Sequence, residues 1–240
     1  MAWTGNNDTR GTATEREFKL NVDGHEVPGV YWEPAGGSDR LVLLGHGGTT
    51  HKKTDYILML VDLLAASGIA SMAIDGPGHG DRKQKGAGDG TGDGMADFAK
   101  TWNEGGGTAF TLVDWKAALD FIESENGARP TGWWGLSMGT MMGLPVCVND
   151  SRISVAVLGL MDTTGVNAKD IIASAPKLSC PVRFLIQWDD ELVPRETALK
   201  LFDMLGSKRK TLIANPGIHQ NVPIPEFESS IRYLDRYLGK

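Results

Sequence analysis

Short apolar runs separated by stretches of helical periodicity constrain the fold of this 240-residue chain more than any other feature. The runs cover residues 41–44, 69–74, 132–135, 153–160 and 182–187, with a weaker one at 211–214. Continuous runs of this length are typical of strands that are buried on both faces. Between and after them, apolar residues at helical spacing predict helices at 56–66, 110–122, 196–205 and 227–238. The alternation predicts an α/β fold with a mostly parallel sheet flanked by helices.

The N-terminal part of the chain has a different pattern. Residues 17–33 alternate apolar and polar side chains around the turn dipeptide Asp23-Gly24, which predicts an antiparallel hairpin at the sheet edge. Residues 1–16 are polar, and we expect them to form a flexible segment. They lack the apolar stretch of a signal peptide, so we expect a protein that is not exported. We expect a single domain over 17–240, because the roughly twenty residues between 160 and 182 leave no room for a large cap domain.

One connection, residues 83–107, is rich in Gly and Asp and longer than an ordinary link between a strand and a helix. Long connections in compact domains are either functional or simply solvated. Two interpretations therefore stay open, a surface loop and a small lid.

Charge and composition exclude several classes of partner. The 30 acidic residues against 24 basic ones give a net charge of -6, the wrong sign for a protein that binds the phosphates of nucleic acid. No window approaches the ~18 apolar residues of a membrane span, so we expect a cytoplasmic protein with no membrane partner. Cys147 and Cys180 lie far apart in the sequence without C-x-x-C spacing, so neither a disulfide framework nor a metal site is expected.

The segment 135–139, Gly-Leu-Ser-Met-Gly, matches the pattern G-x-S-x-G. In this pattern a serine occupies a tight turn between a strand and a helix, and small neighbours let the backbone approach closely. The pentapeptide alone is a weak signal, but an apolar run precedes it and a helix-compatible segment follows. We predict that Ser137 is a catalytic nucleophile.

A serine hydroxyl needs a base, and the base needs a carboxylate that orients it. His219 lies in a turn-rich stretch after the last predicted strand, where a loop can present an imidazole at the carboxyl edge of a sheet, and is our candidate base. Asp190 follows the run 182–187 and is our candidate acid. Asp162 follows the run 153–160 in an equivalent position and stays open as a rival. Of the other histidines, those at positions 25 and 51 are interpreted as solvated and those at 46 and 79 as structural.

Acyl transfer also requires backbone N–H donors for the developing oxyanion. The N–H of Met138, directly after the serine, is the first candidate. The second lies in the early turn 45–48, Gly-His-Gly-Gly, where we choose Gly48 and keep Gly47 as the alternative.

Taken together, the chain resembles an α/β-hydrolase of the dienelactone hydrolase and prolyl-oligopeptidase-like branch. The resemblance rests on the turn 45–48, the segment Asp-Gly-Pro-Gly-His-Gly at 75–80, the G-x-S-x-G pentapeptide, and Asp190 and His219 in the order Ser, Asp, His. It implies a mostly parallel eight-stranded sheet with the site at its carboxyl edge. Dienelactone hydrolases proper use a cysteine nucleophile, so Ser137 argues against dienelactone as the substrate.

The expected function is a serine esterase that acts on small to medium acyl groups and needs no cofactor. We expect Trp188, Met161 and Trp102 to line an apolar substrate pocket. The same triad also suits a thioesterase or a short-peptide hydrolase, because pocket shape rather than fold decides the substrate. A noncatalytic small-molecule-binding protein on the same fold is the alternative from another class.

Overall fold

The computed structural model describes residues 2–83 and 95–238, which fall into two compact units, 1–129 and 130–240. The single domain expected over 17–240 stays a prediction. The elements of unit 1 are β1 (Ala2–Arg10), β2 (Ala13–Val22), β3 (His25–Pro34), β4 (Leu41–Gly45), α1 (Asp55–Ala66), β5 (Ala70–Ile74), the short 3-10 helix η1 (Gly80–Arg82), α2 (Met95–Glu104) and α3 (Gly107–Asn126).

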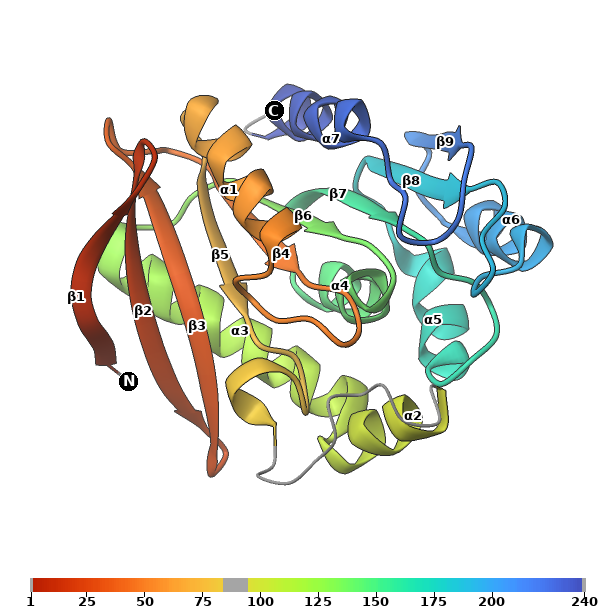
Figure 1. Cartoon of the computed structure of the whole chain (residues 1–240), viewed down its shortest axis with the longest axis horizontal. Helices are drawn as coiled ribbons and strands as arrows, with labels where there is room; N and C mark the ends of the chain where they lie inside the picture. Colours follow the sequence, from red (N-terminus) through yellow and green to blue (C-terminus); the bar gives the residue numbers. More distant parts are fainter. Residues whose placement is uncertain (1, 84–94, 239–240) are drawn as a thin grey trace. The chain divides into compact units, whose positions relative to one another are not determined.

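The strands of unit 1 form a sheet in the order β1, β2, β3, β5, β4. Neighbours pair antiparallel except β4 and β5, which are parallel. The predicted hairpin is confirmed as β2 and β3, joined at Asp23-Gly24, where both residues have positive φ angles of 48° and 88°. Helices α1 and α3 cover opposite faces of this sheet (Figure 1). The buried runs of β4 and β5 form its core.

The prediction of a flexible N-terminal segment is wrong for Ala2–Arg10, which form strand β1 at the edge of the sheet. Gly, Asn and Asp in the middle of this strand have low strand propensity, which hid it in the sequence. A register shift between Thr4 and Asp8 accommodates them. Trp3 anchors the strand, since its ring lies 5.0 Å from the ring of Phe121. Among the described residues the two units therefore contain five and four strands, one more than the eight expected.

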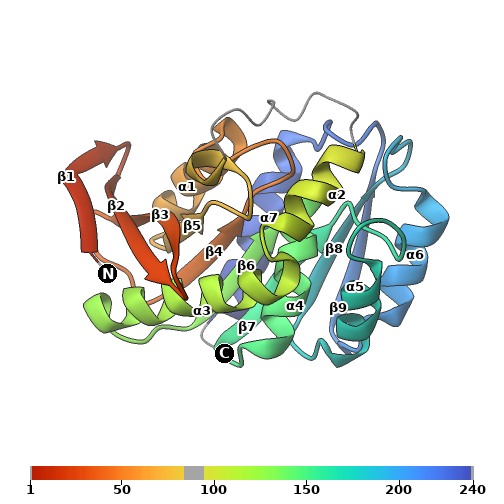
Figure 2. The same ribbon diagram turned by 90° about the horizontal axis from the view of Figure 1, so that it is seen from below.

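Unit 2 contains β6 (Thr131–Gly135), α4 (Met138–Asn149), β7 (Ile153–Gly159), α5 (Ala168–Ser174), the 3-10 helix η2 (Ala175–Lys177), β8 (Val182–Gln187), α6 (Arg195–Met204), β9 (Lys210–Asn215) and α7 (Ile224–Tyr237). Its strands lie in the order β6, β7, β8, β9 and all pair in parallel. Helices α4 and α5 lie on one side of these strands and α7 on the other (Figure 2). Parallel pairing brings the carboxyl ends of all four strands to one edge.

The predicted strands and helices thus correspond to β4 to β9 and to α1, α3, α6 and α7, with ends shifted by a few residues. Within the long connection 83–107, interpreted above as a surface loop or a small lid, residues 95–104 form helix α2. Residues 84–94 of this connection lie outside the described residues. Across 2–83 and 95–238, no helix is both long enough and apolar enough to cross a membrane.

Candidate active site

Ser137 occupies the sharp turn between β6 and α4, with φ 57° and ψ -121°. A positive φ is costly for a residue with a side chain and persists only where the surroundings impose it. Here the turn is tied to the end of β7, because the Ser137 N–H donates to Gly159 O at 2.9 Å. Gly135 permits the tight approach, since a Cβ at that position would lie 2.6 Å from Gly139 O. The strand, turn and helix predicted around the serine are all present.

Ser137, His219 and Asp190 form a continuous hydrogen-bonded chain within unit 2. His219 Nε2 lies 2.9 Å from Ser137 Oγ, and His219 Nδ1 lies 2.8 Å from Asp190 Oδ2. With an ionised carboxylate the Nδ1 proton points to Asp190, so Nε2 is free to accept the serine proton. His219 is 8% exposed. The structure therefore brings together the three residues that the sequence singled out.

The carboxylate of Asp190 is held by the backbone as well as by the imidazole. Its Oδ1 accepts hydrogen bonds from the N–H groups of Leu192 at 2.9 Å and Val193 at 2.8 Å. Burial works against ionisation, but the bonds from His219 and from these N–H groups outweigh it and lower the pKa of Asp190 below its usual value. Asp190 is thus a stable anion at neutral pH.

Asp162, the rival acid, has different partners. Its carboxylate accepts from the Thr164 N–H at 2.8 Å and from the Thr197 hydroxyl at 2.6 Å. These bonds join the loop after β7 to the beginning of α6. The geometry favours Asp190 over Asp162 as the partner of His219.

The two candidate oxyanion donors lie in different units. As the first residue of α4, Met138 has a backbone N–H without an intrahelical acceptor. Gly48 lies in the loop after β4 in unit 1, where its neighbour Gly47 already donates its N–H to Tyr56 Oη at 2.5 Å. Because the N–H of Gly47 is occupied, the structure favours Gly48 of the two glycines.

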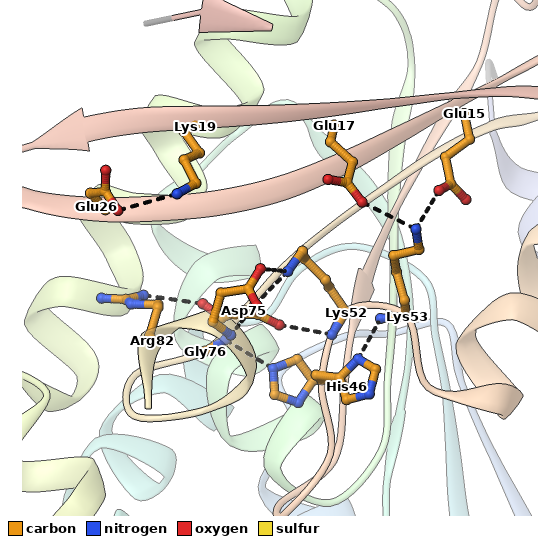
Figure 3. Close-up of polar contacts among 12 residues, drawn as sticks. Glu15, Glu17, Lys19, Glu26, His46, Lys52, Lys53, Asp75, Gly76 and Arg82 are labelled. Carbon is orange, nitrogen blue, oxygen red and sulfur yellow. Dashed lines mark hydrogen bonds and ion pairs between the residues drawn. The ribbon is translucent and has the colours of Figure 1, made fainter. Parts of the chain in front are cut away.

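A buried polar cluster supports this loop within unit 1 (Figure 3). His46 Nε2 accepts the Gly76 N–H at 2.9 Å, and its Nδ1 lies 2.8 Å from Gly47 O. Lys52 Nζ lies 2.7 Å from Asp75 Oδ2, and the Lys52 N–H donates to the other oxygen of that carboxylate. The motif 75–80 therefore braces the loop 46–52.

The three candidate pocket residues differ in exposure. Trp188 follows β8 and is 49% exposed, with the Arg195 guanidinium 4.0 Å above its ring, and Met161 follows β7 with partial exposure. Trp102 lies on α2 in unit 1 and is only 2% exposed. Trp188 is thus the most accessible of the three, and the pocket assignment stays a prediction.

Comparisons with known proteins add independent information. A match to the alpha/beta hydrolase family spans residues 41–229. A PEG-bound complex of a novel cold-adapted esterase from an Arctic intertidal metagenomic library is 57% identical, with a TM-score of 0.92, over 99% of this chain and 100% of that one. The native structure of such an esterase from the same source is 52% identical, with a TM-score of 0.87 and the same coverage.

A more distant similarity bears on the fold alone. The acetyl xylan esterase from Paenibacillus sp. R4 is 20% identical, with a TM-score of 0.73, over 99% of this chain and 88% of that one. A search of curated protein sequences found no significant match.

Proposed function

Because the chain belongs to the alpha/beta hydrolase family, we propose that it cleaves carboxylic esters with Ser137 as nucleophile, His219 as general base and Asp190 as the orienting acid. It is a hydrolase of the carboxylesterase type, and the proteins to which it is 52% and 57% identical are esterases. The observation that carries the proposed mechanism is the chain of hydrogen bonds from Ser137 Oγ through His219 to Asp190.

In the first half of the reaction, Ser137 Oγ attacks the acyl carbon while its proton moves to His219 Nε2. The buried Asp190 carboxylate stabilises the imidazolium that forms. Collapse of the tetrahedral intermediate breaks the bond to the alcohol oxygen, which takes the proton from His219 and leaves. Ser137 then carries the acyl group as an ester.

The second half reverses these roles with water as the nucleophile. His219 takes a proton from water, whose oxygen attacks the acyl carbon, and then returns that proton to Ser137 as the acid is released. In both halves, we propose that the N–H group of Met138 donates to the oxyanion. The chemistry consumes one ester and one water.

Apolar side chains beside the triad support an acyl or alcohol group of small to medium size. Trp188 and Leu192 each lie two residues from Asp190 and are 49% and 60% exposed, and Ile218, next to His219, is 45% exposed. Large apolar side chains exposed together beside polar catalytic groups are typical of binding sites for apolar ligands. We propose that these residues, with Met161, contact the apolar part of the substrate.

The test is hydrolysis of p-nitrophenyl esters from acetate to decanoate by the wild type and by Ser137→Ala and His219→Ala. Both substitutions should lower kcat by about 10³-fold or more, because the parts of a triad act as a unit. Ser67→Ala is the matched control, since Ser67 is an exposed serine at the end of α1. The preferred chain length would measure the acyl site.

A fluorophosphonate reagent separates the alternatives. A serine hydrolase should be labelled at Ser137 and not in the Ser137→Ala variant. A folded wild type with neither turnover nor labelling would favour the noncatalytic binding protein. Labelling without turnover of these esters would instead favour the thioesterase or short-peptide hydrolase that uses the same triad.

A further inference from the structure

The peptide group between Ile218 and His219 is held on both sides by side chains from one short segment, residues 187–191. On one side, Gln187 Nε2 donates to Ile218 O at 3.1 Å. On the other, the His219 N–H donates to Glu191 Oε2 at 2.9 Å. Between them in sequence, Asp190 accepts from the His219 ring. One segment thus contacts the backbone and the side chain of the same histidine.

The turn that carries His219 needs such support. Gly217 has a φ angle of 108°, in a region that only glycine adopts readily, so its own chemistry restricts the backbone little. Main-chain bonds fix the beginning of the turn, from the Trp188 N–H to Asn215 O at 2.7 Å and from the Asp189 N–H to Gly217 O at 3.1 Å. Beyond Gly217, the side chains of Gln187 and Glu191 hold the next peptide group, and its carbonyl also accepts the Asn221 N–H at 3.0 Å. The N–H of this peptide group, which belongs to His219, donates to Glu191.

The two side chains differ in their surroundings. Gln187 is 1% exposed at the end of β8, and its Oε1 has no hydrogen-bond partner among the described residues. Glu191 is exposed. Its carboxylate accepts a charge-assisted hydrogen bond, which is stronger than a hydrogen bond between neutral groups. Glu191 can therefore be changed without opening a cavity in the core, so it is the residue to test.

We propose that Glu191 is a positioning residue, which fixes the His219 backbone so that the ring meets Ser137 Oγ and Asp190 together. The proposal rests on the proposed ester hydrolysis. Catalytic groups displaced by about 1 Å can lose about 10²-fold in rate. Since Asp190 and Glu191 are consecutive, any shift of their loop moves the ring contact and the backbone contact together. Glu191 itself does not touch the reacting atoms.

The experiment compares Glu191→Ala with Glu191→Gln, whose amide oxygen can accept the same hydrogen bond. Glu191→Ala should lower kcat for p-nitrophenyl acetate and the rate of fluorophosphonate labelling together by about tenfold. KM should stay within about twofold, because the change acts on the reacting groups rather than on substrate binding. Glu191→Gln should restore both rates to within about threefold of the wild type.

The matched control is Glu196→Ala, which removes an exposed carboxylate from the first turn of α6 and leaves Glu191 in place. It should leave kcat unchanged. Wild-type rates in Glu191→Ala, or an equal loss in Glu191→Gln and Glu191→Ala, would overturn the proposal. A fall in kcat matched by Glu196→Ala would also overturn it, because general loss of charge would then explain the effect.

Hydrogen exchange of residues 215–221, followed by mass spectrometry, tests the anchor without relying on turnover. Exchange should be faster in Glu191→Ala than in the wild type and near normal in Glu191→Gln. Unchanged exchange in Glu191→Ala would overturn the proposal even if the enzyme were inactive. Failure of the proposed function is recognised separately, as a wild type with neither turnover nor labelling of Ser137.

Discussion

The described part of the chain contains two part-buried pairs of histidine and aspartate, with similar distances and different surroundings. In unit 2, His219 Nδ1 lies 2.8 Å from Asp190, and in unit 1, His25 Nε2 lies 2.6 Å from Asp114. The two carboxylate side chains are 2% and 1% exposed. The prediction that His25, beside the hairpin turn, is solvated is wrong, since its side chain is only 20% exposed and is bound to Asp114.

The two pairs of histidine and aspartate differ in their other hydrogen-bond partners. Asp114 also accepts from the Arg82 guanidinium at 2.7 Å, whereas the other partners of Asp190 include the neutral N–H groups of Leu192 and Val193. The second nitrogen of His219 meets a serine hydroxyl on a strained turn. The second nitrogen of His25 has no hydrogen-bond partner in residues 2–83 and 95–238, and its ring stacks on Phe110 at 4.6 Å. A histidine paired with an aspartate therefore indicates catalysis only when a nucleophile completes it.

Changing each aspartate to asparagine tests whether the two pairs differ in function. Asp190→Asn should lower kcat by about 10³ to 10⁴-fold, because an amide can hold the imidazole in the wrong tautomer. Asp114→Asn should cost about 3 kcal/mol of unfolding free energy, because it removes the charge that pairs with the mostly buried Arg82. Ester turnover and urea unfolding of both variants measure these effects.

We expect Asp190→Asn to lose activity and Asp114→Asn to lose stability. Asp114→Asn should keep its turnover per folded molecule, since no step of the proposed reaction uses Asp114 or its partners His25 and Arg82. Equal loss of kcat in a folded Asp114→Asn would mean that the two pairs are not separate in function.

A third histidine, His46, extends the comparison to a residue that burial keeps neutral. Burial lowers the pKa of His46 to about 4, against a smaller opposing effect of the Gly47 carbonyl and with a further contribution from His79. Between about pH 6.5 and pH 4 the unfolded chain binds a proton that the folded chain does not. The free energy of unfolding should therefore fall as the pH falls through this window, by about 3 kcal/mol from this group.

The variant His46→Gln isolates that contribution, because its amide can donate and accept but does not titrate. Its urea midpoint should be lower than that of the wild type at pH 7.5 and should depend less on pH down to pH 4. The carboxylates titrate in both proteins, so only the difference between the two curves reports on His46. Parallel curves would show that His46 is not kept neutral by the fold.

Elements held by buried apolar side chains could be predicted from the sequence, whereas elements held mainly by backbone hydrogen bonds could not. Strands β4 to β9 bury both faces, so their apolar runs are visible in the sequence. Strand β1 is held at the edge largely by backbone hydrogen bonds to β2, which leave no pattern in its side chains. The candidate triad was predictable because parallel strands end at one edge, which brings residues after β6, β8 and β9 together.

The supporting contacts were not predictable in the same way. His25 and Asp114 are 89 residues apart and meet through side-chain rotamers that no spacing rule encodes. The bond between the His219 N–H and Glu191 depends on the path of the backbone after Gly217. The run Asp189-Asp190-Glu191 marked the right loop, but the separate partner of each carboxylate is visible only in three dimensions.

The variant Asp162→Asn tests whether position at the end of a strand is enough to make an aspartate catalytic. Asp162 follows β7, the neighbour of β8, as Asp190 follows β8, yet it bonds to Thr164 and Thr197 instead of a histidine. Asp162→Asn keeps one acceptor oxygen for these hydroxyls, so it should cost about 1 kcal/mol of stability and change kcat less than about threefold. Kinetics of p-nitrophenyl acetate hydrolysis, with Asp190→Asn measured in parallel, checks this. If Asp162→Asn lost activity as severely as Asp190→Asn while remaining folded, the hydrogen bond to His219 would no longer distinguish the two acids, and the roles of both would have to be reassigned.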